Sequence, residues 1–152
     1  EAIFALDKKH GGFDVLVGHS LGGMSVINSL GRGLKTKKAV IIGSGNKTKD
    51  ITEDFLQSIG MHKKLAPKLI ALFEKRYNDK MDFYDVDAHA QKVEIPVLII
   101  HDKADRDVPY TAAEGIQKNL SQNELLLTNG LGHRKILGDD DVIERIIQFV
   151  ES

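Results

Sequence analysis

One serine of the sequence has neighbours that suit a nucleophile. Ser20 is flanked by Gly18 and Gly22, which gives the pattern Gly-x-Ser-x-Gly. Such a serine lies at a sharp turn from a strand into a helix, and we expect the two glycines to give this strained turn the room it needs. The N–H of Leu21 would then face the oxygen that becomes negative during acyl transfer. The alternative is a turn that only packs glycine closely, because the pattern also occurs by chance.

A serine hydroxyl attacks poorly until a base accepts its proton, and the base is commonly a histidine oriented by a carboxylate. His133 is the candidate base, and its alternative role is that of a surface histidine near a helix. The candidate acids are Asp102, Asp105 and Asp107, which share one segment upstream of it. An aspartate of this segment that is not catalytic is expected to cap the helix beginning near Pro109 or to lie in solvent. The three residue types occur in the order serine, aspartate, histidine.

Short apolar segments rich in β-branched residues alternate with segments of helical periodicity. The predicted buried strands cover residues 13–18, 38–43, 95–101 and 124–128. The predicted helices cover residues 21–30, 111–120 and 139–150, after an N-terminal helix that stops at Gly11. This alternation predicts an α/β fold with a mostly parallel sheet of about four strands and helices on both faces. The serine, acid and histidine segments then meet at the carboxyl edge of the sheet, where ligands bind in such folds.

Residues 48–92 interrupt this alternation, because they show helical patterns and no strand. The predicted helices here cover residues 52–59 and 65–77, with Pro67 in the first turn of the second. A helical insertion between two strands can form a lid or cap, or it can be a long crossover that covers the sheet. Phe83 and Tyr84 would line an acyl pocket in the first case, or anchor the insertion to the sheet.

The three motifs together resemble the C-terminal portion of the α/β-hydrolase fold superfamily, of the esterase, lipase and serine-peptidase type. The family's elbow, Gly-His-Ser-x-Gly-Gly, matches residues 18–23. Its acid loop, His-Gly-x-x-Asp-x-x-Val-Pro, places the catalytic acid on Asp105 and sets Asp102 where the family has glycine. Its Gly-His before the last helix matches Gly132 and His133. The resemblance spans essentially the whole chain, residues 1–152, as a single domain.

The resemblance also implies elements that the sequence does not contain. The family sheet usually has eight strands with the nucleophile after the fifth, whereas Ser20 follows the first predicted strand. About half of the sheet is therefore expected to precede residue 1, together with the loop that gives the family's second oxyanion-hole N–H. The first strand would then be an unpaired edge of the sheet. Such an edge favours pairing with a strand of another chain, for example a second copy in a homo-oligomer.

The function implied is that of a serine hydrolase that cleaves small-molecule carboxylic esters or thioesters without a cofactor. Ser20 would attack the acyl carbon, His133 would move the proton, Asp105 would orient His133, and the Leu21 N–H would stabilise the oxyanion. An alternative of another class is a non-catalytic binding or interaction module, inactive because its oxyanion hole is incomplete. An aminopeptidase of the same fold would need a site for a substrate ammonium, and no residue marks one.

The composition excludes several classes of protein. Lys and Arg number 21 against 22 Asp and Glu, so the charge gives no reason to expect nucleic acid or an acidic membrane surface as a partner. The absence of cysteine excludes disulfides, thiolate catalysis and cysteine-based zinc sites, and it is compatible with the cytoplasm, which is the expected location. No apolar run approaches the length of a membrane span.

The other histidines receive non-catalytic interpretations. His19 is expected to point away from the substrate, and His101 is expected to be structural. His10, His62 and His89 are interpreted as surface or cap residues. No pair of histidines shares metal-ligand spacing with a third ligand, so no metal site is predicted.

Overall fold

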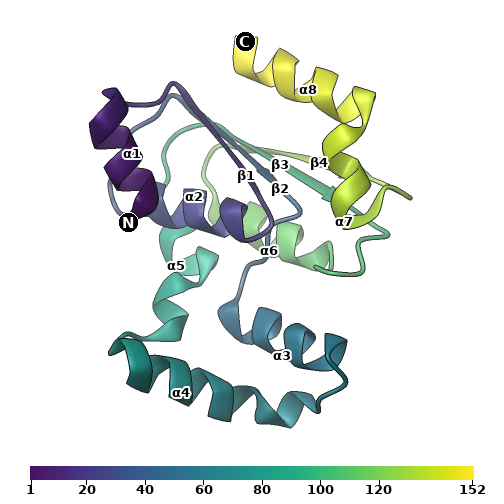
Figure 1. Cartoon of the computed structure of the whole chain (residues 1–152). Helices are drawn as coiled ribbons and strands as arrows, with labels where there is room; N and C mark the ends of the chain where they lie inside the picture. Colours follow the sequence, from purple (N-terminus) through teal and green to yellow (C-terminus); the bar gives the residue numbers. More distant parts are fainter.

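A computed structural model describes all 152 residues and has four parallel strands in one sheet (Figure 1). The strands are β1 (Val15–His19), β2 (Lys38–Ile42), β3 (Val97–Asp102) and β4 (Asn123–Thr128). They lie side by side in sequence order, β1-β2-β3-β4, and every neighbouring pair is parallel. The α/β fold predicted from the alternation of segments is therefore confirmed, and all strands end at one carboxyl edge.

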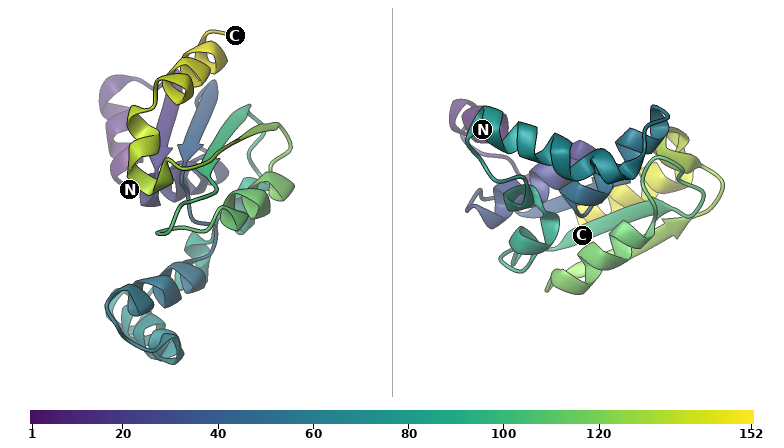
Figure 2. Two further views of the ribbon diagram at one scale, coloured as in Figure 1. Left: turned by 90° about the vertical axis from the view of Figure 1, so that its right-hand side faces the viewer. Right: turned by 90° about the horizontal axis from the view of Figure 1, so that it is seen from below.

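Helices cover both faces of this sheet (Figures 1 and 2). On one face lie α1 (Ala2–His10), α2 (Leu21–Gly31), α5 (Val86–Ala90) and α6 (Thr111–Asn119). On the other face lies α8 (Asp140–Glu151), preceded by α7 (Gly132–Lys135) and a short 3-10 turn at Ile136–Gly138. Alternate residues of β2 and β3 point to the two faces, so Ile41 and Ile99 pack under α2 and α6, while Ile42 and Ile100 pack under α8.

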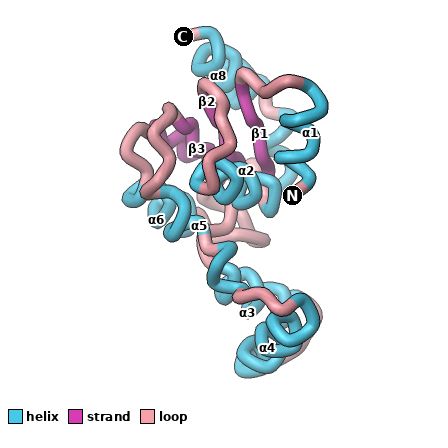
Figure 3. The backbone as a smooth tube through the Cα atoms, turned by 90° about the vertical axis from the view of Figure 1, so that its left-hand side faces the viewer, coloured by secondary structure: helices cyan, strands magenta, loops and turns pink.

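The segment between β2 and β3 is helical and reaches beyond the carboxyl edge of the sheet. It contains α3 (Thr48–Ser58) and α4 (Ala66–Tyr77), with 3-10 turns at Lys63–Leu65 and Met81–Tyr84. These two helices project away from the sheet layers (Figures 2 and 3), and the chain returns through α5, which packs on α2. Asn28 of α2 donates a hydrogen bond of 2.9 Å to the carbonyl oxygen of Tyr84. Phe83 and Tyr84 thus lie where the segment is anchored to the sheet layer.

The sheet is less evenly buried than the apolar segments predict. All of β3 and all of β2 after Lys38 are buried, but the Val17 side chain of β1 is 56% exposed and β4 is only partly buried. The edge strands β1 and β4 therefore do not have two covered faces. No helix of the structure combines the length and apolar character that a bilayer crossing requires.

Candidate active site

Ser20 occupies the strained turn between β1 and α2 that the glycine pattern predicts. Its φ is 55° and its ψ is −122°, a conformation that is costly for a residue with a side chain. Its N–H donates a hydrogen bond of 2.9 Å to the carbonyl oxygen of Ile42, at the end of β2. This bond ties the serine to the carboxyl edge of the sheet, so the strain is held in place by the neighbouring strand.

Of the two glycines that the pattern names, Gly18 has the role predicted for it and Gly22 does not. A Cβ on Gly18 would lie 2.5 Å from the carbonyl oxygen of Gly22, which the backbone cannot accommodate. A Cβ on Gly23 would lie 2.7 Å from the Cβ of Ser44. A Cβ on Gly22 would meet nothing within 4 Å, so the expectation that Gly22 provides room is wrong. The close approach of α2 to the strands instead requires Gly18 and Gly23.

The N–H of Leu21 is available for a ligand. Leu21 is the first residue of the 11-residue helix α2, and no hydrogen bond in the structure uses its N–H. The first N–H groups of a helix have no partner within the helix, and the helix dipole favours negative charge near them. Leu21 directly follows Ser20 in the sequence, so its N–H belongs to the residue next to the nucleophile. A donor of an oxyanion hole has to lie close to the carbon that the nucleophile attacks.

Asp105 and His133 form a direct pair across two loops of the sheet edge. His133 Nδ1 donates a hydrogen bond of 2.7 Å to Asp105 Oδ2, and the two side chains are only 11% and 1% exposed. Asp105 Oδ1 accepts hydrogen bonds from the N–H groups of Asp107 (2.8 Å) and Val108 (2.9 Å). A proton on Nδ1 leaves Nε2 of His133 free to accept another. The Asp107 side chain is exposed and makes no such contact.

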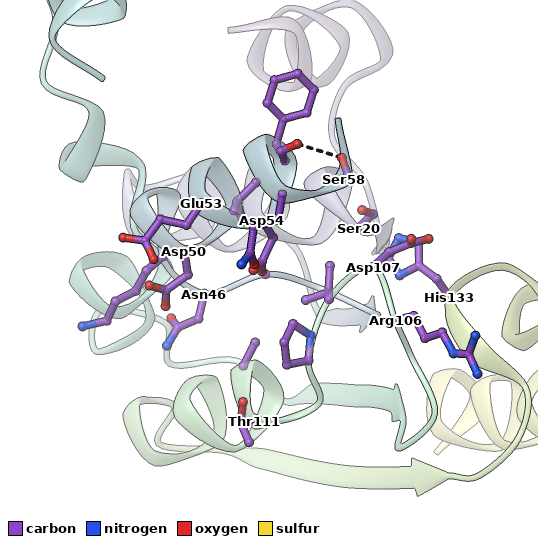
Figure 4. A pocket seen from close by; sticks show the side chains of 18 of the residues that line it. Ser20, Asn46, Asp50, Glu53, Asp54, Ser58, Arg106, Asp107, Thr111 and His133 are labelled. Carbon is purple, nitrogen blue, oxygen red and sulfur yellow. Dashed lines mark hydrogen bonds between the residues drawn. The ribbon is translucent and has the colours of Figure 1, made fainter. Parts of the chain in front are cut away.

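Ser20 and His133 line the same cavity of about 920 Å³. Figure 4 shows both side chains on one side of this cavity, with Asp50 and Glu53 of α3 across it. Ser20 makes no direct hydrogen bond to His133 in this structure. The cavity is open and is lined mostly by polar and charged side chains. The fold therefore brings the three predicted residues to one rim of the sheet.

Comparison with known proteins adds the fold family. No protein-family model matches the sequence, and the comparison with curated proteins gives no match. Among solved structures, an esterase from Exiguobacterium antarcticum superposes with a TM-score of 0.71 at 17% identity, over 99% of this chain and 72% of that chain. A monoacylglycerol lipase from Paleococcus ferrophilus gives 0.65 at 22% identity, over 99% of this chain and 71% of that chain.

A third structure names the fold. It is an alpha/beta hydrolase enzyme from a sediment metagenome of the lagoon of Mar Chica, Morocco, with a TM-score of 0.70 at 19% identity, over 99% of this chain and 67% of that chain. The chain has the α/β-hydrolase fold. The resemblance noted in the sequence is thereby confirmed for the fold. Because one fold hosts many reactions, the chemistry of this α/β-hydrolase-fold chain has to be argued from its site.

Gly43 is a site residue that sequence reasoning missed. It directly follows β2 in this α/β-hydrolase fold and has a φ of 55°. A Cβ here would lie 3.2 Å from His133 Nδ1 and 3.5 Å from Asp105 Oδ2, so the hydrogen-bonded pair packs directly on its backbone. The only signal in the sequence is a glycine at the end of a predicted strand, which gave no indication of what lies against it.

We expect Gly43→Ala to displace the His133 ring and to slow reaction of Ser20 with a fluorophosphonate by about ten-fold, because small misplacements of reacting groups are costly. Gly33→Ala is the matched control, since Gly33 also has a positive φ but a Cβ there meets nothing within 4 Å. The measurement is the second-order rate of labelling of each folded variant. Equal rates for the two variants would show that the contact with His133 has no consequence.

Asp102 has neither of the roles expected of a non-catalytic aspartate in this loop. It is fully buried, and it neither caps a helix nor lies in solvent. Its carboxylate accepts hydrogen bonds from the Thr128 hydroxyl (2.7 Å) and from backbone N–H groups of both loops of the pair. Burial raises the pKa of Asp102, but the hydrogen bonds from the backbone and from Thr128 outweigh this effect and lower the pKa to about 2.

Asp102 should make folding stability depend on pH in the acid range. Its pKa in the folded chain, about 2, lies below the ordinary 3.8, so its charged form stabilises the fold by about 2 kcal/mol. This contribution is complete above pH 3.8 and is lost as the pH falls through about 2. Urea unfolding between pH 7 and 2 should therefore show a smaller acid loss of stability for Asp102→Asn than for the parent. Parallel curves for the two proteins would contradict the assignment.

Two further histidines contact the residues of the pair in this α/β-hydrolase fold. His19 Nε2 lies 2.9 Å from the carbonyl oxygen of His133, and the two ring centres are 4.6 Å apart. His101 is fully buried, as a structural role predicts, and its Nε2 lies 2.9 Å from the carbonyl oxygen of Val108 and 3.4 Å from Asp105 Oδ2. Both rings therefore fix the backbone of the loops that carry Asp105 and His133.

The surface interpretation of His89 is wrong. His89 is only 4% exposed, and its Nε2 lies 2.8 Å from the carbonyl oxygen of Phe83. Its burial follows from the close packing of α5 on α2, where a Cβ on Gly31 would lie 2.6 Å from the Cβ of His89. His10 and His62 are exposed as expected. Nowhere does the structure group three His, Asp or Glu side chains so that they could hold a metal ion.

Proposed function

We propose that this chain is a serine hydrolase that cleaves carboxylic esters or thioesters through an acyl-enzyme. The observation that carries the proposal is the 2.7 Å hydrogen bond between His133 and Asp105, in the cavity that also exposes the strained Ser20. A histidine held by a carboxylate and facing a serine at a strand-to-helix turn is the arrangement that acyl transfer requires. The esterase and lipase among the similar structures support the same class of reaction.

In this mechanism the Ser20 hydroxyl attacks the acyl carbon while His133 Nε2 accepts its proton. Asp105 holds the Nδ1 proton and stabilises the imidazolium that forms. The Leu21 N–H donates to the oxyanion of the tetrahedral intermediate. The intermediate collapses when His133 gives the proton to the departing alcohol or thiol. Water then attacks the acyl-enzyme with His133 again as base, and Ser20 is regenerated with a carboxylic acid as the product.

We further propose that residues 48–92 act as a cap on this site. The α3 helix supplies Asp50, Glu53 and Phe55 to the wall of the cavity that contains Ser20. The α4 helix lies beyond α3 and packs on it. A helical segment in this place limits which substrates reach Ser20, as insertions at the ligand edge of α/β sheets do.

A fluorophosphonate probe tests the proposal, because it reacts with a serine hydroxyl only when a base activates the hydroxyl. We expect stoichiometric labelling, mapped by mass spectrometry to Ser20, and loss of labelling in His133→Gln. An intact fold without labelling would instead favour a non-catalytic binding module. The observation that favours this second function is that Ser20 and His133 make no direct hydrogen bond.

We also propose that two copies of the chain associate through the edge of β1. This strand has a neighbour on one side only, and its Val17 side chain is 56% exposed. Unpaired strand edges with apolar side chains favour pairing, and an added charge opposes it. Light scattering should find a dimer for the parent and a shift toward monomer for Val17→Lys. A parent that is monomeric over the accessible concentration range would contradict the association.

A further inference from the structure

The Asp102 carboxylate ends β3, and donors occupy both of its oxygens. Oδ1 accepts hydrogen bonds from the N–H groups of Ala104 (2.8 Å) and Gly130 (3.2 Å). Oδ2 accepts from the Thr128 hydroxyl (2.7 Å) and from the N–H of Leu131 (3.0 Å). The carboxylate has no cationic partner and no exposed surface. A buried charge of this kind is tolerated only because several donors satisfy it at once.

Three of the four donors belong to the two loops that carry Asp105 and His133, and the fourth, the Thr128 hydroxyl, lies at the end of β4. Ala104 directly precedes Asp105, and Leu131 stands two residues before His133. Thr128 and Gly130 belong to the end of β4 and to the turn that follows it. One carboxylate therefore fastens the loop after β3 to the loop after β4, immediately before each loop presents its member of the pair. In the pattern that the sequence resembles, a glycine stands at this position, and a glycine has no side chain with which to join the loops.

We propose that Asp102 is a positioning residue of the site: through its hydrogen bonds to both loops it sets the separation of Asp105 and His133. The proposal rests on the proposed function for its catalytic consequence, but its structural content concerns the pair alone. Asp102 touches neither Ser20 nor the cavity. It acts through the backbone, because the N–H groups that it binds fix the start of each loop.

The geometry requires a carboxylate and not merely a polar side chain. A carboxylate offers only acceptors, and all four donors point at it. In Asp102→Asn one oxygen is replaced by an NH₂ group, so a donor then faces the N–H of Gly130 or of Leu131, both of which belong to the loop after β4. That half of the connection is lost, while the volume of the side chain is unchanged. The variant therefore removes hydrogen bonds between the two loops while it keeps the packing of the side chain at position 102.

A role in stability alone is the rival explanation, since a buried carboxylate also contributes to folding. Asp139→Ala is a suitable control, because the Asp139 carboxylate caps α8 by accepting from the Val142 N–H (3.1 Å), and it lies outside the cavity. Its loss destabilises the fold without changing either loop. Thr128→Val is a second test variant that removes one of the four donors and preserves shape, so it serves even where Asp102→Asn does not fold.

The experiment records two properties of the folded parent, Asp102→Asn, Thr128→Val and Asp139→Ala. The first is the downfield NMR resonance of the His133 Nδ1 proton, assigned by its loss in His133→Gln. The second is the rate of fluorophosphonate labelling of Ser20. We expect Asp102→Asn to broaden or shift the resonance and to slow labelling about 10- to 100-fold, and Thr128→Val to do both to a smaller extent. Asp139→Ala should leave both at the parent values.

Parent-like resonance and labelling in both Asp102→Asn and Thr128→Val would overturn the positioning role. Equal losses in Asp139→Ala would also overturn it, because general destabilisation would then be sufficient. An unlabelled parent would refute the proposed function and not this inference. In that case the His133 resonance alone tests the positioning role of Asp102. An unchanged resonance in both Asp102→Asn and Thr128→Val would refute that role.

Discussion

Ser20→Ala should reduce ester hydrolysis by at least about 10⁴-fold and abolish fluorophosphonate labelling, because alanine has no hydroxyl that could attack and give its proton to His133. In the structure Ser20 is the hydroxyl-bearing residue that stands at the strained turn, at the rim that His133 also lines. Alanine fits there because a Cβ is already present, so the fold should be unaffected. The measurement is turnover of a p-nitrophenyl ester by purified parent and variant, corrected for spontaneous hydrolysis.

Ser25→Ala is the matched control for this loss. Ser25 lies on α2, the helix that follows Ser20, and its hydroxyl donates to the Leu21 carbonyl oxygen (2.9 Å) in an exposed position. We expect parent-like turnover for this variant. Full turnover in Ser20→Ala would mean that water or another residue attacks the ester, and the proposed acyl-enzyme would be abandoned.

Asp105→Asn should reduce turnover by about 10³- to 10⁴-fold. An amide at this position can present an NH₂ group to His133 Nδ1, which favours the tautomer with its proton on Nε2. That tautomer cannot accept the proton of Ser20. The Asp105 side chain is only 1% exposed and is fixed by two backbone N–H groups, so water cannot readily replace the lost interaction. The measurement is again turnover of the p-nitrophenyl ester.

Asp107→Asn distinguishes the two nearby acids. The Asp107 carboxylate is exposed and does not contact His133, although its backbone N–H supports Asp105. We expect its substitution to change turnover by less than about ten-fold, because the backbone is retained. If Asp107→Asn were the damaging change and Asp105→Asn the mild one, the assignment of the acid would be reversed.

The sequence predicts the parts of the site that depend on local patterns. Apolar runs locate β1 and β2 within two residues, although only β2 has the burial on both faces that such a run indicates. The turn at Ser20 follows from the spacing of Gly18 and Gly22, although packing shows that Gly23 and not Gly22 is the second required glycine. The order of the strands then carries Asp105 and His133 to the same edge.

Contacts between distant segments could not be predicted in the same way. His133 lies against Gly43, although the two residues follow different strands of the sheet. No local sequence pattern around either residue indicates this contact. Asp102 reads as an ordinary loop aspartate, because its four donors come from the opposite loop and from a backbone turn. The α3 helix begins at Thr48, before its predicted start at residue 52, because the hydroxyl and N–H of Thr48 bind the Asp85 carboxylate from across the segment.

The polar lining of the cavity bears on which substrates suit this chain. The α3 wall carries Asp50, Glu53 and Asp54, and the loop after β3 contributes Arg106. Burial, and then the neighbouring charges of Asp50 and Glu53, raise the pKa of Asp54 above its ordinary value. For the proposed hydrolase we therefore expect short or polar esters to be better substrates than esters of a long apolar acid, which would contact few apolar side chains here.

The acyl-enzyme itself gives the most direct test of the claim that Ser20, His133 and Asp105 work as one unit. The chain is mixed with p-nitrophenyl acetate, quenched in acid within the first turnover, digested and examined by mass spectrometry. We expect one acetyl group on the peptide that contains Ser20, at a level that falls to background in His133→Gln and in Asp105→Asn. Acetylation confined to lysine side chains, or acetylation of Ser20 that persists in both variants, would contradict this claim.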